Sequence, residues 1–353
     1  MKLFKLLLSL IVILGLLAIL AGCPKIADKA VSVEPKGMVY FDFFDTVSYI
    51  YSYANDSQKD FEARCKGASS ILLEYHKMFD IYYEHSGVVN LRTLNLNAGG
   101  EAIKVDEKLI DFLLYAKELY TLTGGEMNIM MGSVLSIWHD CREQAGTNPA
   151  QARIPTEDEL NEARLHTDIS TLEIDKENLT VRITDPKASI DVGALGKGYA
   201  TEKAAQYLRS IGAESYVLNI GGNIRIVGHK IDGASWATGI KNPENPETYV
   251  KTIMLADTSC VTSGNYERYF TVDGVRYHHI IDKDTLMPAN YFSSVSIITP
   301  DSGLADALST ALFAMSYEDG LKIVESLENV EVLWITPDGT QYATPGIENL
   351  VKQ

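Results

Sequence analysis

Cysteine is scarce in this sequence, and its few copies do not form a bracing pattern. The 353 residues contain four cysteines, and no two of them stand as a C-x-x-C pair. Cys65, Cys141 and Cys260 are far apart, and an odd number argues against a disulfide framework. We therefore expect each of these three to be a small, buried, apolar side chain.

Positive charge is also in short supply. The chain has 31 lysines and arginines against 47 aspartates and glutamates, which gives a formal net charge of −16. Such an acidic chain does not attract nucleic acid or an anionic membrane surface, so we expect no nucleic acid among its partners. A phosphorylated ligand would have to be held locally, by backbone amides, a few cations or a metal.

The longest apolar run stands at the N-terminus. Lys2 and Lys5 precede it, residues 6–20 form it, and the small residues of LAGC at 20–23 follow it. This run of about 15 residues is shorter than the roughly 20 that span a bilayer, and its layout is typical of a secretory signal. The cysteine after the small residues resembles a bacterial lipobox, in which Cys23 is lipidated and becomes the new N-terminus.

We therefore predict a signal peptide over 1–22 and a lipidated Cys23 with a tether over 23–38. The protein would then be anchored by lipid on the extracytoplasmic face of the cell membrane. Removal of 1–22 takes away two lysines and leaves a net charge of −18. An uncleaved apolar anchor with an incidental cysteine is the alternative.

Repeats, low-complexity tracts and a second linker are absent from the rest of the sequence. Runs of strands alternate irregularly with helices, which argues against a doubly wound sheet and for one α+β domain over 39–349. The apolar patterns predict helices that start near 57, 106, 156, 198, 303 and 318, and strands or hairpins over 38–53, 171–184, 215–228, 250–256, 268–282, 293–299 and 330–344.

A glycine cluster, DVGALGKGYA at 191–200, precedes one of these helices. Two residues stand between Gly193 and the Gly196–Lys197 pair, where a P-loop needs four, and a dinucleotide fingerprint needs another order of glycines. What remains is a strand end at Asp191, a glycine turn, a lysine and a helix N-terminus, which favours an anion. A phosphate site and a plain strand–turn–helix connection both fit this pattern. We expect the glycines to let a ligand approach the backbone.

Two further segments offer chemistry. ADALSTALF places Asp306 and Thr310 four residues apart on one helix face, within an apolar stretch where a lone carboxylate would be costly to bury. Oxygen ligands of this kind suit Mg²⁺, although Asp306 could instead cap the helix start. His278 and His279 are neighbours on a predicted strand, so only one of them can face a given side.

Five motifs in this order are similar to those of the ApbE-type FAD:protein FMN transferases. They are TGGEMNIMMGSVLSIWHD, IDVGALGKGYATEKA, NIGGN, TSGNYERYF with RYHHIID, and ADALSTALF. The resemblance spans roughly residues 40–345. It implies a T-fold-like α+β domain with mixed or antiparallel sheets flanked by helices. It also implies a Mg²⁺-dependent reaction that splits FAD, places FMN on a threonine or serine of an exported protein, and releases AMP.

The resemblance also implies roles for individual residues. Asp191 and Lys197 would contact FAD, and the Ala194 carbonyl would join Asp306 and Thr310 around the metal. The other flavin contacts would be Phe44, Tyr82, Glu126, Met127, Asn128 and Ile280. His279 and Asp306 are the candidate general bases, and we favour His279 because the metal would occupy Asp306.

The sequence departs from the family at one of these places. Many members have Ala-Phe-Asp-Pro where this chain has Glu126-Met127-Asn128-Ile129, so a charge and a stacking surface are lost.

Two other activities stay open. The first is an FAD pyrophosphatase on the same fold, which would release FMN and AMP. The second is a lipoprotein that binds flavin without chemistry; apart from the resemblance, a solute-binding lipoprotein would be the default.

Overall fold

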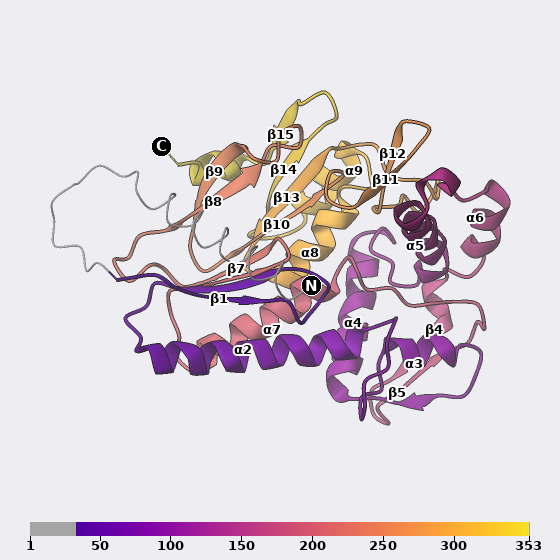
Figure 1. Ribbon diagram of the computed structural model, residues 1–353, viewed down its shortest axis with the longest axis horizontal. Helices are drawn as coiled ribbons and strands as arrows, with labels where there is room; N and C mark the ends of the chain where they lie inside the picture. The colour runs from indigo at the N-terminus through magenta and orange to yellow at the C-terminus, as the bar shows by residue number, and fades with distance from the viewer. Residues whose placement is uncertain (1–32, 353) are drawn as a thin grey trace. The chain divides into compact units, whose positions relative to one another are not determined.

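We describe residues 33–352 of a computed structural model, so the predicted signal peptide and Cys23 lie outside the described residues. The centre of this part is an eight-stranded antiparallel sheet with the order β1-β2-β6-β7-β10-β13-β14-β15 (Figure 1). Its strands are β1 (Lys36–Tyr40), β2 (Ser48–Ser52), β6 (Tyr216–Ile220), β7 (Asn223–Val227), β10 (Ser259–Gly264), β13 (Ser294–Thr299), β14 (Glu331–Ile335) and β15 (Gln341–Ala343). The predicted α+β class with antiparallel sheets is confirmed.

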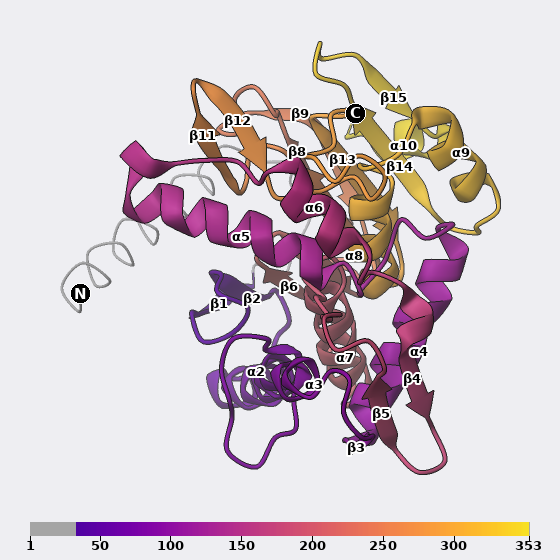
Figure 2. The same cartoon turned by 90° about the vertical axis from the view of Figure 1, so that its right-hand side faces the viewer.

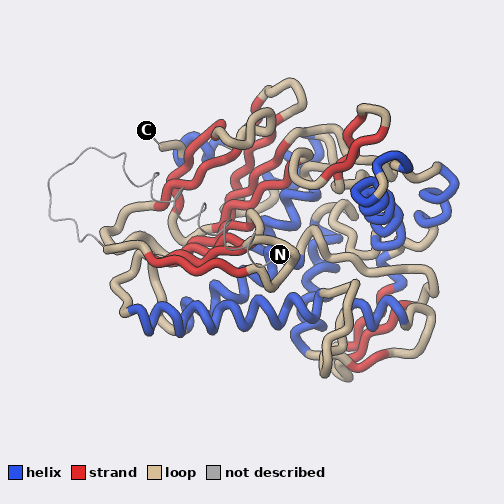
Figure 3. The backbone as a smooth tube through the Cα atoms, in the orientation of Figure 1, coloured by secondary structure: helices blue, strands red, loops and turns tan. Residues whose placement is uncertain are grey.

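Both faces of this sheet are covered. On one face lie α7 (Gly196–Ser210) and α8 (Ser302–Ala311), and α2 (Gln58–Phe79) packs along α7. The hairpin of β8 (Trp236–Lys241) and β9 (Tyr249–Leu255) covers the other face together with α10 (Pro345–Leu350). All six residues of β13 are buried as a result. In Figure 3, which has the orientation of Figure 1, the long helix α2 runs below the strands of the sheet.

Smaller elements lie around the N-terminal end of α7. They include a three-stranded sheet of β3 (Ile103–Lys104), β5 (Thr180–Ile183) and β4 (Leu172–Asp175), and the hairpin of β11 (Tyr269–Val272) and β12 (Val275–His278). The remaining helices are α3 (Leu91–Leu96), α4 (Glu107–Leu122), α5 (Gly132–Thr147), α6 (Glu157–Arg164) and α9 (Tyr317–Glu325). In Figure 2, α5 and α6 lie in front of the sheet, near the hairpin.

Three helices start where the sequence predicts, at residues that cap them. Ser57, Asp106 and Thr156 cap α2, α4 and α6 with their side chains, and Thr156 and Glu159 form a capping box. The first strand begins at Lys36, within the predicted 23–38 tether. The helix predicted to start near 303 is α8, which begins at Ser302 and ends at Ala311.

Burial of the three remaining cysteines agrees with their predicted role. Cys65, Cys141 and Cys260 are all buried and unpaired, each in a different apolar cluster. Burial raises the pKa of Cys65 and of Cys260 to about 12, so both stay neutral thiols.

Among the helices of residues 33–352, none has the length and apolar character needed to cross a membrane.

Candidate active site

The glycine cluster forms a turn that leads directly into α7. The Asp191 carboxylate accepts the Gly193 N–H at 2.8 Å, and α7 begins at Gly196 without a side-chain cap. Lys197 lies in the first turn, where its Nζ donates to the Gly193 carbonyl at 3.2 Å. The N-terminal amides of α7 and the lysine therefore lie together, as the anion-site interpretation requires.

Helix α8 brings Asp306 to this same end of α7. The Asp306 Oδ2 accepts the Gly198 N–H at 2.8 Å and lies 3.7 Å from the Lys197 ammonium. The aspartate is only 4% exposed. Because Oδ2 binds the Gly198 amide and the Lys197 ammonium, the other oxygen of this buried carboxylate stays available to a ligand. Asp306 is in the fifth position of α8, whose N-cap is Asp301, so the capping alternative for Asp306 is wrong.

The glycines serve helix packing more than ligand approach. A Cβ on Gly198 would lie 2.3 Å from the Ser302 carbonyl oxygen and 2.4 Å from the Asp306 Cβ. Only glycine therefore lets α7 and α8 come this close, and that contact places Asp306. A Cβ on Gly196 would meet Phe79 at 3.1 Å, on the side of the core. The expectation that Gly196 opens the backbone to a ligand is wrong.

Further oxygen atoms lie beside Asp306. Thr310 is one helical turn later, and its hydroxyl is 3.4 Å from the Ser263 hydroxyl of β10, which also contacts Ser309 at 2.8 Å. The Ala194 carbonyl accepts no hydrogen bond from any residue in 33–352, because the Gly198 amide is bound to Asp306 instead. A carboxylate, a hydroxyl and a free carbonyl form the hard donor set that Mg²⁺ takes. These residues therefore fit the predicted metal.

The two adjacent histidines have different hydrogen-bond partners. His278 is buried, its Nε2 bonds the Ala289 carbonyl at 2.7 Å, and its Nδ1 accepts the Ile280 N–H. His279 lies on the other side, where its Nδ1 contacts the Arg268 carbonyl at 3.2 Å. A carbonyl can only accept, so His279 carries its proton on Nδ1 and leaves Nε2 free as a base. Burial and the Arg268 charge lower the pKa of His279 to about 3.

Cations gather around the turn of this acidic chain. The positive charges of Arg142 and Lys197 act on Asp191, although burial still raises the pKa of this carboxyl. The Tyr82 and His139 rings lie 5.2 Å apart between centroids in a tilted arrangement, and burial together with the charge of Asp191 raises the pKa of Tyr82 to about 12. Arg142, which donates to His139 at 2.9 Å, therefore stands beside both Tyr82 and Asp191.

The loop of 126–131 lies against the same turn through backbone contacts. The Asp191 N–H bonds the Ile129 carbonyl at 2.8 Å, and residues 131 and 189 form a parallel bridge. Met127 is buried in the core, and the Asn128 amide donates to the Thr167 carbonyl at 2.9 Å. Glu126 pairs with Lys283 at 3.2 Å. These side chains hold the loop in place, and their contact with flavin stays a prediction.

Phe44 lies in a strained turn between β1 and β2. Its φ is +57° and that of Asp45 is +48°, a left-handed conformation that costs free energy for residues with a Cβ. The Phe44 N–H donates to His76 Nδ1 at 3.2 Å, and its ring meets that imidazole edge to face. Such strain often accompanies a functional site. The contacts of Phe44 and of the buried Ile280 with flavin stay predictions.

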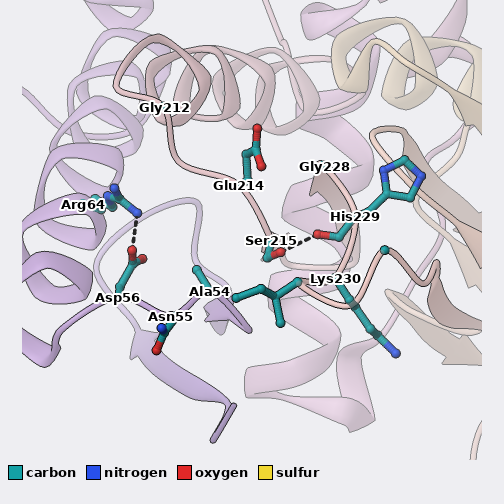
Figure 4. Close-up of a pocket in the computed structure, with 12 residues that line it drawn as sticks. Ala54, Asn55, Asp56, Arg64, Gly212, Glu214, Ser215, Gly228, His229 and Lys230 are labelled. Carbon is teal, nitrogen blue, oxygen red and sulfur yellow. Dashed lines mark hydrogen bonds and ion pairs between the residues drawn. The ribbon is translucent and has the colours of Figure 1, made fainter. Parts of the chain in front are cut away.

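A separate hollow lies at the far end of α7. Figure 4 shows its polar lining, in which Asp56 pairs with Arg64 at 2.5 Å and the Ser215 hydroxyl donates to the His229 carbonyl. Gly212 lines this hollow and follows the C-terminal end of α7, whereas Lys197 lies in the first turn of that helix. Asp56 and Arg64 in this hollow already pair with each other, and the hollow lies away from Lys197 and Asp306, so we place the candidate site at the N-terminus of α7.

The structure therefore gathers most of the predicted residues around one helix end. Sequence reasoning missed His139 and Arg142 on α5, Arg268 before β11, and Ser263 on β10. His139 and Arg142 are three residues apart, which places them on one helix face, so their spacing was a usable signal. Arg268 and Ser263 come from separate strands and carried no such signal.

Comparison with known proteins identifies the family of this chain. The model of the ApbE family matches residues 45–334. A FAD:protein FMN transferase of Vibrio cholerae is 32% identical over 343 residues, which is 95% of this chain and 96% of the relative. The protein of that name from Treponema pallidum is 32% identical over 277 residues, with 74% and 75% of the two chains covered.

Solved structures agree with the sequence comparison. The ApbE protein of Thermotoga maritima superposes with a TM-score of 0.78 at 29% identity, over 91% of this chain and all of that one. The flavin transferase ApbE of Vibrio cholerae gives 0.75 at 29% identity, over 90% and 99% of the two chains. These matches cover most of the chain, and the chain is therefore a member of the ApbE family.

Proposed function

We propose that this chain transfers FMN from FAD to a threonine or serine hydroxyl of an exported acceptor protein and releases AMP. The observation that carries the proposal is the meeting of Asp306 on α8 with the Gly198 amide and Lys197 at the N-terminus of α7. Charge, dipole and oxygen ligands converge there, as the cleavage of a pyrophosphate requires. The relatives that bear the transferase name support the choice of substrate.

Asp306, Thr310 and the Ala194 carbonyl would hold Mg²⁺. When bound, Mg²⁺ neutralises phosphate charge and orients the in-line attack. Lys197 would bind a pyrophosphate oxygen, and the free amides of α7 would bind others. Arg142 and Arg268 would exclude competing orientations by adding positive charge on the side that carries Tyr82 and His279.

His279 is suited to take the proton of the acceptor hydroxyl. Its Nδ1 proton is held by the Arg268 carbonyl, which leaves the Nε2 lone pair available. The acceptor oxygen then bonds to the FMN phosphorus, the P–O bond to AMP breaks, and the hydroxyl proton passes to Nε2. A bound pyrophosphate would raise the pKa of His279 by its negative charge and make it a stronger base.

The location of this reaction follows from the N-terminal sequence. A signal over 1–22 and a lipid on Cys23 would place the domain on the extracytoplasmic face of the membrane, where exported acceptors are found. The tether of 23–38 would let the domain reach acceptors in the same membrane. Because the signal and Cys23 lie outside the described part, this element of the proposal rests on the sequence, and only the part of the tether before β1 at Lys36 can act as a link.

The dependence of the activity on Mg²⁺ tests the assigned metal ligands. Release of AMP from FAD should require Mg²⁺ and should be abolished in Asp306→Asn, which keeps the shape and removes the charge. Thr310→Ser should retain activity and Thr310→Val should lose most of it, because only the first keeps a hydroxyl. Activity that survives a chelator, or that is equal in both Thr310 variants, would contradict the assigned metal ligands.

A further inference from the structure

A second group of metal-ligating side chains lies at the C-terminal end of α2. His76 is in the last turn of the helix, Asp80 is its C-cap, and His85 follows in the next loop. One ligand atom from each of the three lies within 4.8 Å of the others, and among residues 33–352 this is the one such group of histidines, cysteines and carboxylates. The mechanism proposed above uses none of the three.

The aspartate of this cluster is held in a fixed direction. Asp80 Oδ1 accepts the backbone N–H groups of Tyr82 at 2.7 Å and Tyr83 at 2.9 Å. Its other oxygen, Oδ2, contacts the His85 Nε2 at 2.8 Å. Burial would raise the pKa of Asp80, but these backbone bonds outweigh it and lower the pKa. The carboxylate is therefore charged, nearly buried and directed at an imidazole.

We propose that His76, Asp80 and His85 form a binding site for a divalent transition metal of the zinc class, separate from the Mg²⁺ site. His76 and Asp80 are four residues apart, so they present their ligand atoms from adjacent turns. Two imidazoles and one carboxylate match the three-ligand sites in which zinc keeps an open position. Mg²⁺ prefers oxygen donors and would not compete well here.

Occupation of this site changes the bond that holds Phe44. A neutral imidazole on a metal has the metal on one nitrogen and a proton on the other. His76 could then no longer accept the Phe44 N–H at Nδ1, whichever nitrogen binds the metal. The strained turn at Phe44 and Asp45 is released as a result. Since Phe44 is a predicted flavin contact, zinc should weaken FAD binding, and this consequence rests on the proposed function.

Titration with Co²⁺ tests the site directly. The purified full chain, kept in excess Mg²⁺ to fill the oxygen site, is titrated with Co²⁺ and followed by its visible absorption, with Zn²⁺ as competitor. We expect one equivalent to bind in the unmodified chain. His76→Ala and His85→Ala should each weaken binding at least as much as the roughly 10–100-fold cost of losing an outer partner. His85→Asn is a second variant should the alanine fail to fold.

A matched control comes from another histidine–aspartate pair. His166 contacts Asp185 at 2.7 Å, but no second histidine joins them, so His166→Gln should leave Co²⁺ binding unchanged. Absence of a Co²⁺ equivalent, or binding that both His76 and His85 variants retain, would overturn the site. FAD affinity is measured with and without Zn²⁺ on the same samples. Failure of FAD to bind at all would count against the proposed function, while the Co²⁺ result would still decide the site.

Discussion

At the scale of single residues, the cations near the candidate site are Lys197, Arg142 and Arg268. Lys197 is the charged group that touches both the glycine turn and Asp306, through the Gly193 carbonyl and the carboxylate. In a chain with net charge −16, a single lysine at a helix N-terminus is an effective local attractor for phosphate.

Replacing Lys197 with alanine should weaken FAD binding about ten- to hundredfold. A charge-assisted hydrogen bond contributes roughly 1.5–3 kcal/mol, which corresponds to that change in affinity. Lys203→Ala is the matched control, because Lys203 is on the same helix but lies over the Tyr199 ring. Titration followed by flavin fluorescence measures both variants. Equal affinities for the two would remove Lys197 from the pyrophosphate site.

At the scale of elements, the site depends on how closely α7 and α8 approach. The absence of a Cβ at Gly198 lets the α8 backbone and Asp306 come within a distance that no other residue allows. This approach places the Asp306 carboxylate at the Gly198 amide, so the packing of α7 against α8 sets the geometry of the site. A side chain at this position would act on stability and on activity together.

Gly198→Ala should lower the free energy of unfolding by about 1–3 kcal/mol, the usual cost of overpacking, and should also reduce AMP release. Gly146→Ala on α5 is the control: nothing lies within 4 Å of its Cβ, and alanine is the better helix former by roughly 0.5–1 kcal/mol. Urea unfolding and an AMP assay give the two readouts. Gly198→Ala with unchanged stability would mean that the helices need no such contact.

Element by element, the sequence predicted those structures that carry local signals. Helices α2, α4 and α6 were predicted by their starts, and β6–β7 and β14–β15 by the ranges of their strands or hairpins. Helices α3 and α5 were not predicted: α3 has six residues, and α5 starts without a side-chain cap. Strand β8 was also missed, since it pairs only with β9 in a separate hairpin.

The candidate site was predicted less completely than the fold. Asp191, Lys197, Asp306 and Thr310 come from motifs with short internal spacing, and the structure brings them together. The contributions of Arg268, Ser263 and the His76 cluster depend on contacts between elements that are far apart in the chain. Periodicity reports which face of an element is apolar, but it does not report which other element covers that face.

At the scale of the whole molecule, buried histidines set the response to acid. Burial lowers the pKa of His76 and His278, and burial with the Arg268 charge lowers that of His279 to about 3, against a usual 6.5. The unfolded chain therefore binds more protons than the folded chain below about pH 6.5. Folding stability contributed by these neutral histidines is present above that pH and is lost as the pH falls.

The urea midpoint should accordingly drop between about pH 7 and about pH 5, and His279→Gln should reduce this slope. The imidazole of His279 is removed while its neighbours Arg268 and His278 stay in place. A midpoint that is flat over this range, or a slope that His279→Gln leaves unchanged, would show that these histidines are not neutral in the folded chain.

Membrane attachment is a prediction for the whole molecule, and it rests on the N-terminal sequence. Cys23→Ala should release the protein from the membrane fraction or leave the precursor uncut, because no lipid can then be attached. Fractionation with detection of the precursor size distinguishes the two outcomes. Unchanged attachment with an uncut N-terminus in both forms would indicate a simple apolar anchor.

The central claim is that FMN is moved to a protein, and one measurement tests it most directly. The purified chain is incubated with FAD, Mg²⁺ and a candidate acceptor that carries an exposed threonine, and intact masses are recorded. The account predicts that the acceptor gains the mass of FMN less one water, that AMP appears in equal amount, and that Asp306→Asn produces neither. Release of FMN and AMP with no modified protein would contradict transfer and indicate hydrolysis, while flavin binding without cleavage would contradict both enzymes.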